Sequence, residues 1–185
     1  MATMALLLSG CGGDSENASN TSADQTASAS PSQSMGEMDG MAMGDPSATP
    51  ANKVADAKVV KGSFKLLDTR PPGMDDVKGT AWLAQGPKGT TVTVSLTGLK
   101  PGERYMSHLH AQKCSAENGG EHFQFEKGGA TTPPNEVHLM FTADKSGTGM
   151  MTVNNDRKTG EGAAAIVVHP MAAQDNRIAC ADFAF

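Results

Sequence analysis

Short apolar segments rich in β-branched residues, separated by Gly and Pro turn signals, most restrict the fold open to this 185-residue chain. The clearest segment is residues 91–96, where polar and apolar residues alternate strictly, as in a half-buried β-strand. No stretch combines the period and the length of a helix. The predicted strands span residues 58–67, 79–84, 90–96, 105–110, 137–141, 149–153, 163–169 and 177–183. The pattern predicts an all-β antiparallel sandwich or flattened barrel of about eight strands.

One connection between these strands, residues 111–136, is too long for a hairpin. Irregular loops of this length in compact domains are usually functional or disordered. Because this loop contains Cys114 and His122, we expect it to be functional.

Composition divides the chain near Val54. Residues 12–53 contain no aromatic residue, no Leu and no Ile, so they cannot bury enough apolar surface to order themselves. We therefore predict a disordered tether rich in Met, Ser and Ala over residues 12–53 and one folded domain over residues 54–185. The tether carries the whole formal net charge of −5, the domain is formally neutral, and no basic run favours nucleic acid as a partner.

The N-terminal residues 1–11 end in Leu8-Ser9-Gly10-Cys11, which resembles a bacterial lipobox whose Cys is lipidated. The apolar run before it, residues 4–8, is too short to span a bilayer. We interpret residues 1–11 as an export signal, which makes the protein lipid-anchored on the extracytoplasmic side of a bacterial membrane. The alternative is a chance Leu-Ser-Gly-Cys.

The two remaining cysteines, Cys114 and Cys180, form an even pair in the predicted domain. Disulfides persist in exported proteins, so the pair is either a disulfide or two buried free thiols.

All five histidines lie in the C-terminal half of the chain: His108, His110, His122, His138 and His169. His108 and His110 are two residues apart, which puts both rings on one face of a strand. Taken singly, each is more often a surface or hydrogen-bonded residue than a ligand. Together they are a set of nitrogen ligands that suits Cu(II) or zinc.

The order of several motifs resembles the copper-zinc superoxide dismutase family over about residues 54–185. The motifs are Gly98-Leu99-Lys100-Pro101-Gly102, His108-Leu109-His110, Cys114, Gly119-Gly120-Glu121-His122-Phe123, His138, Ala165-Ile166-Val167-Val168-His169 and Arg177-Ile178-Ala179-Cys180. The resemblance implies a Greek-key β-barrel in which His108, His110, His122 and His169 bind copper. It also implies a disulfide between Cys114 and Cys180.

The same resemblance implies superoxide as the substrate and Arg177 as the residue that guides this anion to the metal. Arg177 would supply a permanent positive charge, although without the resemblance a surface salt bridge is an equal alternative. Dismutation needs an ion that changes oxidation state, so copper can serve alone and zinc cannot. No apolar patch in the sequence identifies an oligomer interface.

The zinc ligands expected of the family are incomplete. Residues 125–129 contain no His, and His138-Leu139-Met140-Phe141 stands where the family has His, any residue, Gly and Asp. Only His122 and His138 remain, which is too few for a stable zinc site, so zinc is doubtful and His138 is a candidate residual zinc ligand. The loss favours a slower or more pH-sensitive dismutase, or a copper site used for another purpose.

Four methionines, Met35, Met38, Met41 and Met43, cluster in the tether. Thioethers bind Cu(I), so we hypothesise auxiliary copper binding; a compositional accident or an oxidisable scavenger are the alternatives. The leading prediction is a copper-dependent superoxide dismutase at the cell surface. Its alternatives are a dismutase-like copper carrier with little turnover and a purely structural sandwich.

Overall fold

The computed structural model describes residues 43–185, in which regular structure consists of β-strands and two short 3₁₀ turns. The strands are β1 (Lys58–Ser63), β2 (Lys65–Leu66), β3 (Lys78–Gly86), β4 (Gly89–Thr97), β5 (Arg104–His110), β6 (His138–Thr142), β7 (Gly149–Asn155), β8 (Ala165–Pro170) and β9 (Ala179–Asp182). The turns are η1 (Ala51–Lys53) and η2 (Glu117–Gly119). The predictions for Cys11, Met35, Met38 and Met41 lie outside the described residues.

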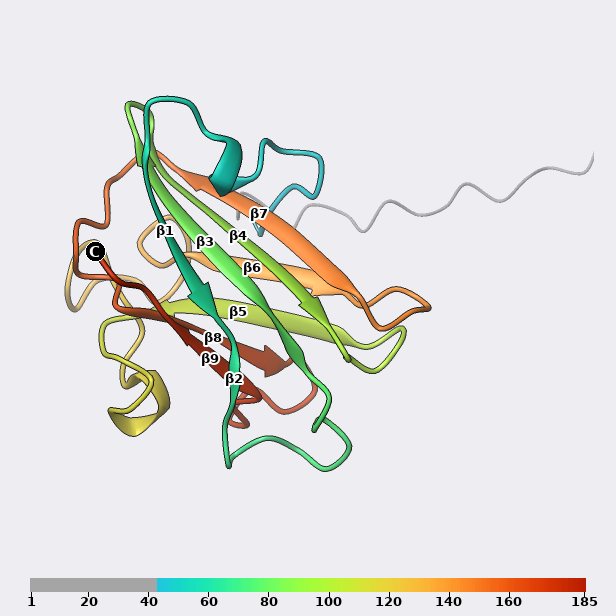
Figure 1. Ribbon diagram of the computed structural model, residues 1–185. Coiled ribbons are helices and arrows are strands. Elements are labelled where there is room, and N and C mark those ends of the chain that lie inside the picture. Colours follow the sequence, from blue (N-terminus) through green and yellow to red (C-terminus); the bar gives the residue numbers. More distant parts are fainter. Residues whose placement is uncertain (1–42) are drawn as a thin grey trace, which may run out of the picture. The chain divides into compact units, whose positions relative to one another are not determined.

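Two antiparallel sheets pack face to face (Figure 1), with strand orders β1-β3-β4-β7 and β2-β9-β8-β5-β6. Strands distant in sequence are neighbours, since β4 pairs with β7 and β5 with β8, as a Greek key requires. Each sheet keeps two edge strands, so the fold is a sandwich and not a closed barrel. The predicted all-β Greek-key sandwich is confirmed.

Alternation along β5 separates the core from the outer face of its sheet. Tyr105 and Leu109 are buried in the core between the sheets. His108 and His110 occupy the intervening positions and therefore point to the opposite face. Both are nevertheless almost fully buried. The histidines thus lie under the loops that cover this outer face.

The first predicted strand is two strands, which is why the fold has nine rather than about eight. Residues 58–63 pair with β3 in the first sheet, whereas Lys65 and Leu66 pair with β9 in the second. The break falls at Phe64, whose side chain is buried in the core. The chain therefore crosses from one sheet to the other at Phe64, whose buried ring fixes the crossing point. The sequence pattern, which is continuous over residues 58–67, did not reveal this change of sheet.

Residues 43–53 belong to the folded part, although the sequence interpretation placed them in the tether. The Met140 amide donates to the Met43 carbonyl at 2.9 Å, and the Asp45 amide donates to the Thr152 carbonyl at 2.8 Å. These bonds join the segment to β6 and β7. Ala51 in η1 is fully buried, and its amide donates to the Thr93 hydroxyl at 2.9 Å. Folded structure thus extends upstream of Val54.

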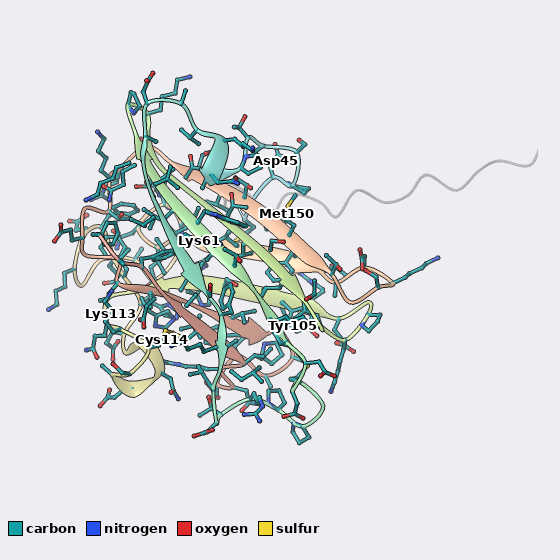
Figure 2. The ribbon with its side chains drawn as sticks, in the orientation of Figure 1. Asp45, Lys61, Tyr105, Lys113, Cys114 and Met150 are labelled. Carbon is teal, nitrogen blue, oxygen red and sulfur yellow. A yellow bond between two sulfur atoms is a disulfide. The ribbon has the colours of Figure 1, made fainter. Side chains whose placement is uncertain are left out.

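The predicted disulfide between Cys114 and Cys180 is present, and it ties the long loop to β9. Two further contacts reinforce this tie: the Cys114 amide donates to the Asp182 carboxylate at 2.7 Å, and the Lys113 amine donates to the Phe183 carbonyl. Figure 2 shows Lys113 and Cys114 together on this loop, beside the C-terminal strands. Among the described residues, no helix is long and apolar enough to cross a membrane.

Candidate metal centre

The sheet register brings the histidines together from separate strands. His138 at the start of β6 lies opposite His108 on β5, and His169 on β8 lies opposite the β5 residue Met106. His122, in the long loop, forms an isolated β-bridge with His110. Because alternate residues share a face, the four strand histidines and the loop histidine meet on the outer face of the second sheet.

The first group of side chains consists of His108, His110, His122 and His169, which each offer a ligand atom within 4.8 Å of the others. The ring centroid of His108 is 4.2 Å from that of His122 and 5.2 Å from that of His169. Three of the rings are buried and His122 is partly exposed. The four predicted copper ligands are therefore adjacent in space.

The second group shares His122 with the first and adds Glu136 and His138, again with ligand atoms within 4.8 Å of one another. One oxygen of Glu136, Oε2, is 2.7 Å from His122 Nδ1 and 3.0 Å from His138 Nε2. The His138 ring packs against the four-histidine group, 4.4 Å between ring centroids from His108, but its Nε2 points to Glu136.

Hydrogen bonds fix which nitrogen of each ring faces the centre. The Nδ1–H of His110 donates to the Gly120 carbonyl at 3.0 Å, and that of His169 donates to the Gln174 carbonyl at 2.7 Å. The Nδ1–H of His122 donates to Glu136. These acceptors select the tautomer that leaves Nε2 free to bind a metal ion.

Three ring nitrogens at this centre are buried without a hydrogen-bond partner among residues 43–185: His108 Nδ1, His110 Nε2 and His169 Nε2. A buried polar atom with no partner costs free energy, and such atoms are rare in folded proteins. A bound metal ion would satisfy all three at once. The donor set therefore fits a metal centre.

Burial keeps these imidazoles neutral, which is the form that binds metal. It lowers the pKa of His110 to about 3 and that of His169 to about 4, and repulsion from neighbouring cationic groups adds to the effect. Burial, followed by repulsion from His122, lowers the pKa of His108 further still. Burial also lowers the pKa of His138, although Glu136 partly opposes it. The site is thus prepared for a cation at neutral pH.

Glu136 is the site residue that the sequence analysis missed. Burial raises the pKa of its carboxyl group, but hydrogen bonds with His138, Gln124 and His122 outweigh that effect and hold the pKa below its ordinary value. The carboxyl group is therefore ionised at neutral pH. It is also buried, since Glu136 is only 2 % exposed. One signal was present: Glu136 and His138 are two apart at a strand start, which places them on one face.

Arg177 is held by the carbonyls of one turn. Its guanidinium donates to Glu117, Asn118 and Gly120 at 2.8, 3.1 and 3.0 Å. All four residues 117–120 have positive φ, and a Cβ on Gly119 would lie 3.2 Å from the His110 ring. The carbonyl of Gly120 also accepts from His110, so one peptide group orients both side chains.

A cleft of about 820 Å³ leads to this centre, and His122, Glu136 and Arg177 line it. Lys127 and Glu121 are also at its wall. Arg177 makes no ion pair within residues 43–185, because its partners are carbonyls. Its charge is thus available to an anion in the cleft.

No family model matches the sequence, and no curated protein matches it. Solved structures do match: a Cu/Zn superoxide dismutase from Brucella abortus superposes with a TM-score of 0.52 at 19% identity, covering 69% of this chain and 100% of that chain. The chain has the fold of the copper-zinc superoxide dismutases. On that fold it carries a histidine cluster that could bind metal.

Proposed function

We propose that the protein is a copper-dependent superoxide dismutase that acts outside the cytoplasm. The observation that carries the proposal is the set of buried ring nitrogens without partners on His108, His110 and His169, which converge with His122 within 4.8 Å. Four imidazoles gathered in one place, three of them almost fully buried, are typical of a metal-ligand set and unusual in a packed core.

The four imidazoles, with neither thiolate nor carboxylate among them, would hold copper. When bound, copper would supply an ion that changes oxidation state, which dismutation of superoxide to oxygen and hydrogen peroxide requires. Zinc fits the same nitrogens but has no redox chemistry. The copper assignment therefore rests on the reaction, and metal analysis must test it.

Arg177 would bind and orient superoxide in the cleft. Its guanidinium is always charged, and the three carbonyls hold it in one position without neutralising it. A fixed cation in a partly enclosed cleft raises the local concentration of a small anion. This is the role expected of Arg177 from the sequence, now supported by its unpaired charge.

Glu136 would hold His122 in place of a second metal ion. Its carboxylate keeps the proton on His122 Nδ1 and so presents Nε2 to the centre. The second group, with two imidazoles and one carboxylate, also resembles zinc sites with three protein ligands. Zinc thus remains the alternative occupant, and bound metal at two ions per chain would reveal it.

The proposed location outside the cytoplasm follows from Leu8-Ser9-Gly10-Cys11, which would be lipidated at Cys11. The disulfide between Cys114 and Cys180 supports it, because structural disulfides persist mainly in oxidising compartments. Membrane contact would then be through the lipid anchor alone.

The test uses the full chain reconstituted with copper, with metal content and superoxide decay measured together. We expect about one copper per chain and decay faster than for the metal-free protein. His169→Ala should remove copper and activity, whereas His138→Ala should retain both. Copper at one per chain without added decay would reject the enzyme, and copper lost equally in both variants would reject the ligand assignment.

The second candidate is a copper carrier with little turnover, and the methionine cluster favours it. Met43, the last methionine of this cluster, is bonded through its carbonyl to Met140 on β6, the strand that begins with His138. The cluster thus ends beside the sheet that bears the histidines. Replacing Met35, Met38, Met41 and Met43 with Leu should slow copper loading at limiting copper. An unchanged loading rate would show that these methionines do not deliver copper to the histidines.

A further inference from the structure

The loop between His122 and His138 is organised by a second set of contacts that the proposed function does not explain. This loop lacks the histidine expected for zinc, yet it places Glu136 2.7 Å from His122 Nδ1. Among residues 123–136, Asn135 is the residue around which the hydrogen bonds gather. It is 8 % exposed and lies directly before Glu136.

The side-chain amide of Asn135 pairs with both backbone polar groups of Glu126, as a residue of a neighbouring β-strand would. Its Oδ1 accepts from the Glu126 amide at 2.7 Å, while its Nδ2 donates to the Glu126 carbonyl at 2.9 Å. Nδ2 also donates to the Ala130 carbonyl at 2.9 Å. One amide thereby uses its acceptor and both donors to close the segment 126–130.

The backbone of Asn135 extends the same network. Its carbonyl accepts from the Phe125 amide at 3.0 Å, and its own amide donates to the Thr132 carbonyl at 3.0 Å. A Cβ on Gly129 would lie 2.8 Å from Asn135 Nδ2, so the loop wraps closely around this side chain. Every one of these partners is a protein group.

Gln124 connects the network to the carboxylate. Its Nε2 donates to Glu136 Oε1 at 2.9 Å, and its Oε1 accepts from the Gly128 amide at 2.9 Å. Glu136 Oε2 is taken by His122 and His138. Both oxygens of the carboxylate are therefore held by side chains of the protein.

We infer that Asn135 is a positioning residue, whose side-chain amide holds residues 125–130 in shape and thereby sets Glu136 against His122 without a metal ion. The inference deepens the proposed function because it rests on His122 as a ligand. It says that the loop is complete before any metal binds. The tests below use metal-free protein, so they can fail or succeed independently of copper binding and activity.

The first test measures amide hydrogen exchange in the metal-free full chain. We expect the amides of Phe125, Glu126 and Glu136 to exchange at least about tenfold more slowly than unstructured amides. Adding Zn²⁺ or Cu²⁺ should change these rates by less than about twofold. Protection that appears only after metal is added would overturn the inference, and this test needs no variant.

The second test compares Asn135→Asp with Asn154→Asp, a matched change on the exposed strand position of β7. In Asn135→Asp, exchange of the loop amides should accelerate roughly tenfold or more, because the two hydrogen bonds donated by Nδ2 are lost and a carboxylate then faces the carbonyls of Glu126 and Ala130. The amides of Val92 and Val94 in β4 should be unchanged, which shows that the fold remains. Asn154→Asp should leave both sets unchanged.

A third measurement tests whether Asn135 positions Glu136 against His122 or only stabilises the loop. Nitrogen-15 spectra of the metal-free protein should show His122 protonated at Nδ1 in the wild type and as a mixture of tautomers in Asn135→Asp. A variant that loosens the loop but keeps the His122 tautomer would overturn the link to His122. Loop amides as slow in Asn135→Asp as in the wild type would overturn the inference entirely.

Discussion

Glu136 is a buried carboxylate whose two oxygens are both held by neighbouring side chains. It is a charged carboxylate buried among His122, His138 and Gln124, and its partners outweigh the desolvation that would otherwise favour the neutral form. Buried carboxylates of this kind usually orient a ligand or carry out chemistry. Here the carboxylate orients a proposed ligand, since it touches the ring nitrogen of His122 that faces away from the centre.

The substitution Glu136→Gln should weaken copper binding by about 10 to 100-fold, the usual effect of removing a group that orients a ligand. The neutral amide keeps the size of the side chain, but it cannot accept from both His122 and His138 as strongly. Competition against a copper chelator measures the effect. Glu126→Gln, an exposed carboxylate of the same loop, is the control, and equal affinities for the two variants would contradict the role.

Arg177→Ala should lower kcat/KM for superoxide about tenfold while copper content stays at one per chain, because a steering charge is lost and the ligands remain. The remaining activity should depend less on ionic strength. The kcat/KM of Arg177→Lys should lie between those of the wild type and Arg177→Ala, because lysine keeps the charge but cannot donate to the three carbonyls as a planar group. Arg70→Ala, which removes a half-buried arginine paired with Asp75, is the control; an equal loss of kcat/KM in that variant would contradict steering.

At the scale of elements, the loop of residues 111–120 owes its position to the disulfide with β9. Cross-linking Cys114 and Cys180, 66 residues apart, constrains the unfolded chain by about 4 kcal/mol on the entropic estimate. Reduction should lower the free energy of unfolding by that order and loosen the turn that holds Arg177. Urea denaturation with and without reductant measures it, with metal absent from both samples.

Removal of residues 1–53 should destabilise the domain by about 1 to 3 kcal/mol relative to removal of residues 1–42, because the shorter protein loses three hydrogen bonds to the sheets. It also exposes the surface that Ala51 covers. Urea denaturation of the two proteins compares them directly. Equal stability would mean that the segment 43–53 contributes nothing to the fold.

At the scale of the whole molecule, acid should destabilise the metal-free protein. The folded-state pKa values of His110 and His169 lie at about 3 and about 4, below the ordinary value of 6.5. Between pH 6.5 and about 4 the unfolded chain therefore binds more protons, and stability falls as pH falls. Glu136 adds to the loss at lower pH, since its pKa is also lowered on folding.

Each of these two histidines should contribute about 1.4 kcal/mol per pH unit in that window, and the contribution should vanish above pH 6.5. Urea denaturation at several pH values measures the slope. His169→Gln should reduce the slope of unfolding free energy against pH by about 1.4 kcal/mol per pH unit, the contribution of one histidine. A slope that is flat between pH 6.5 and 4 would show that the buried rings are already charged in the folded state.

The sequence predicted the sheets better than it predicted the loops between them. Alternation in residues 91–96 is a local property, and β4 forms there as expected. The split at Phe64 and the packing of Ala51 depend on partners far along the chain, so no local period could reveal them. Residues 43–53 are polar and small, yet three hydrogen bonds to the sheets order them.

At the site, sequence by itself determined the set of candidate ligands: five histidines in a fixed order, a cysteine pair and one arginine. Only the tertiary structure decided how they divide, because His138 packs beside His108 but directs its Nε2 to Glu136, in the second group. It also decided the role of Glu136 and Asn135, whose partners lie across a folded loop. The physical reason is that residue types determine which side chains can bind a metal ion, whereas hydrogen bonds between distant parts of the chain determine which ring nitrogen of each histidine is free to bind it.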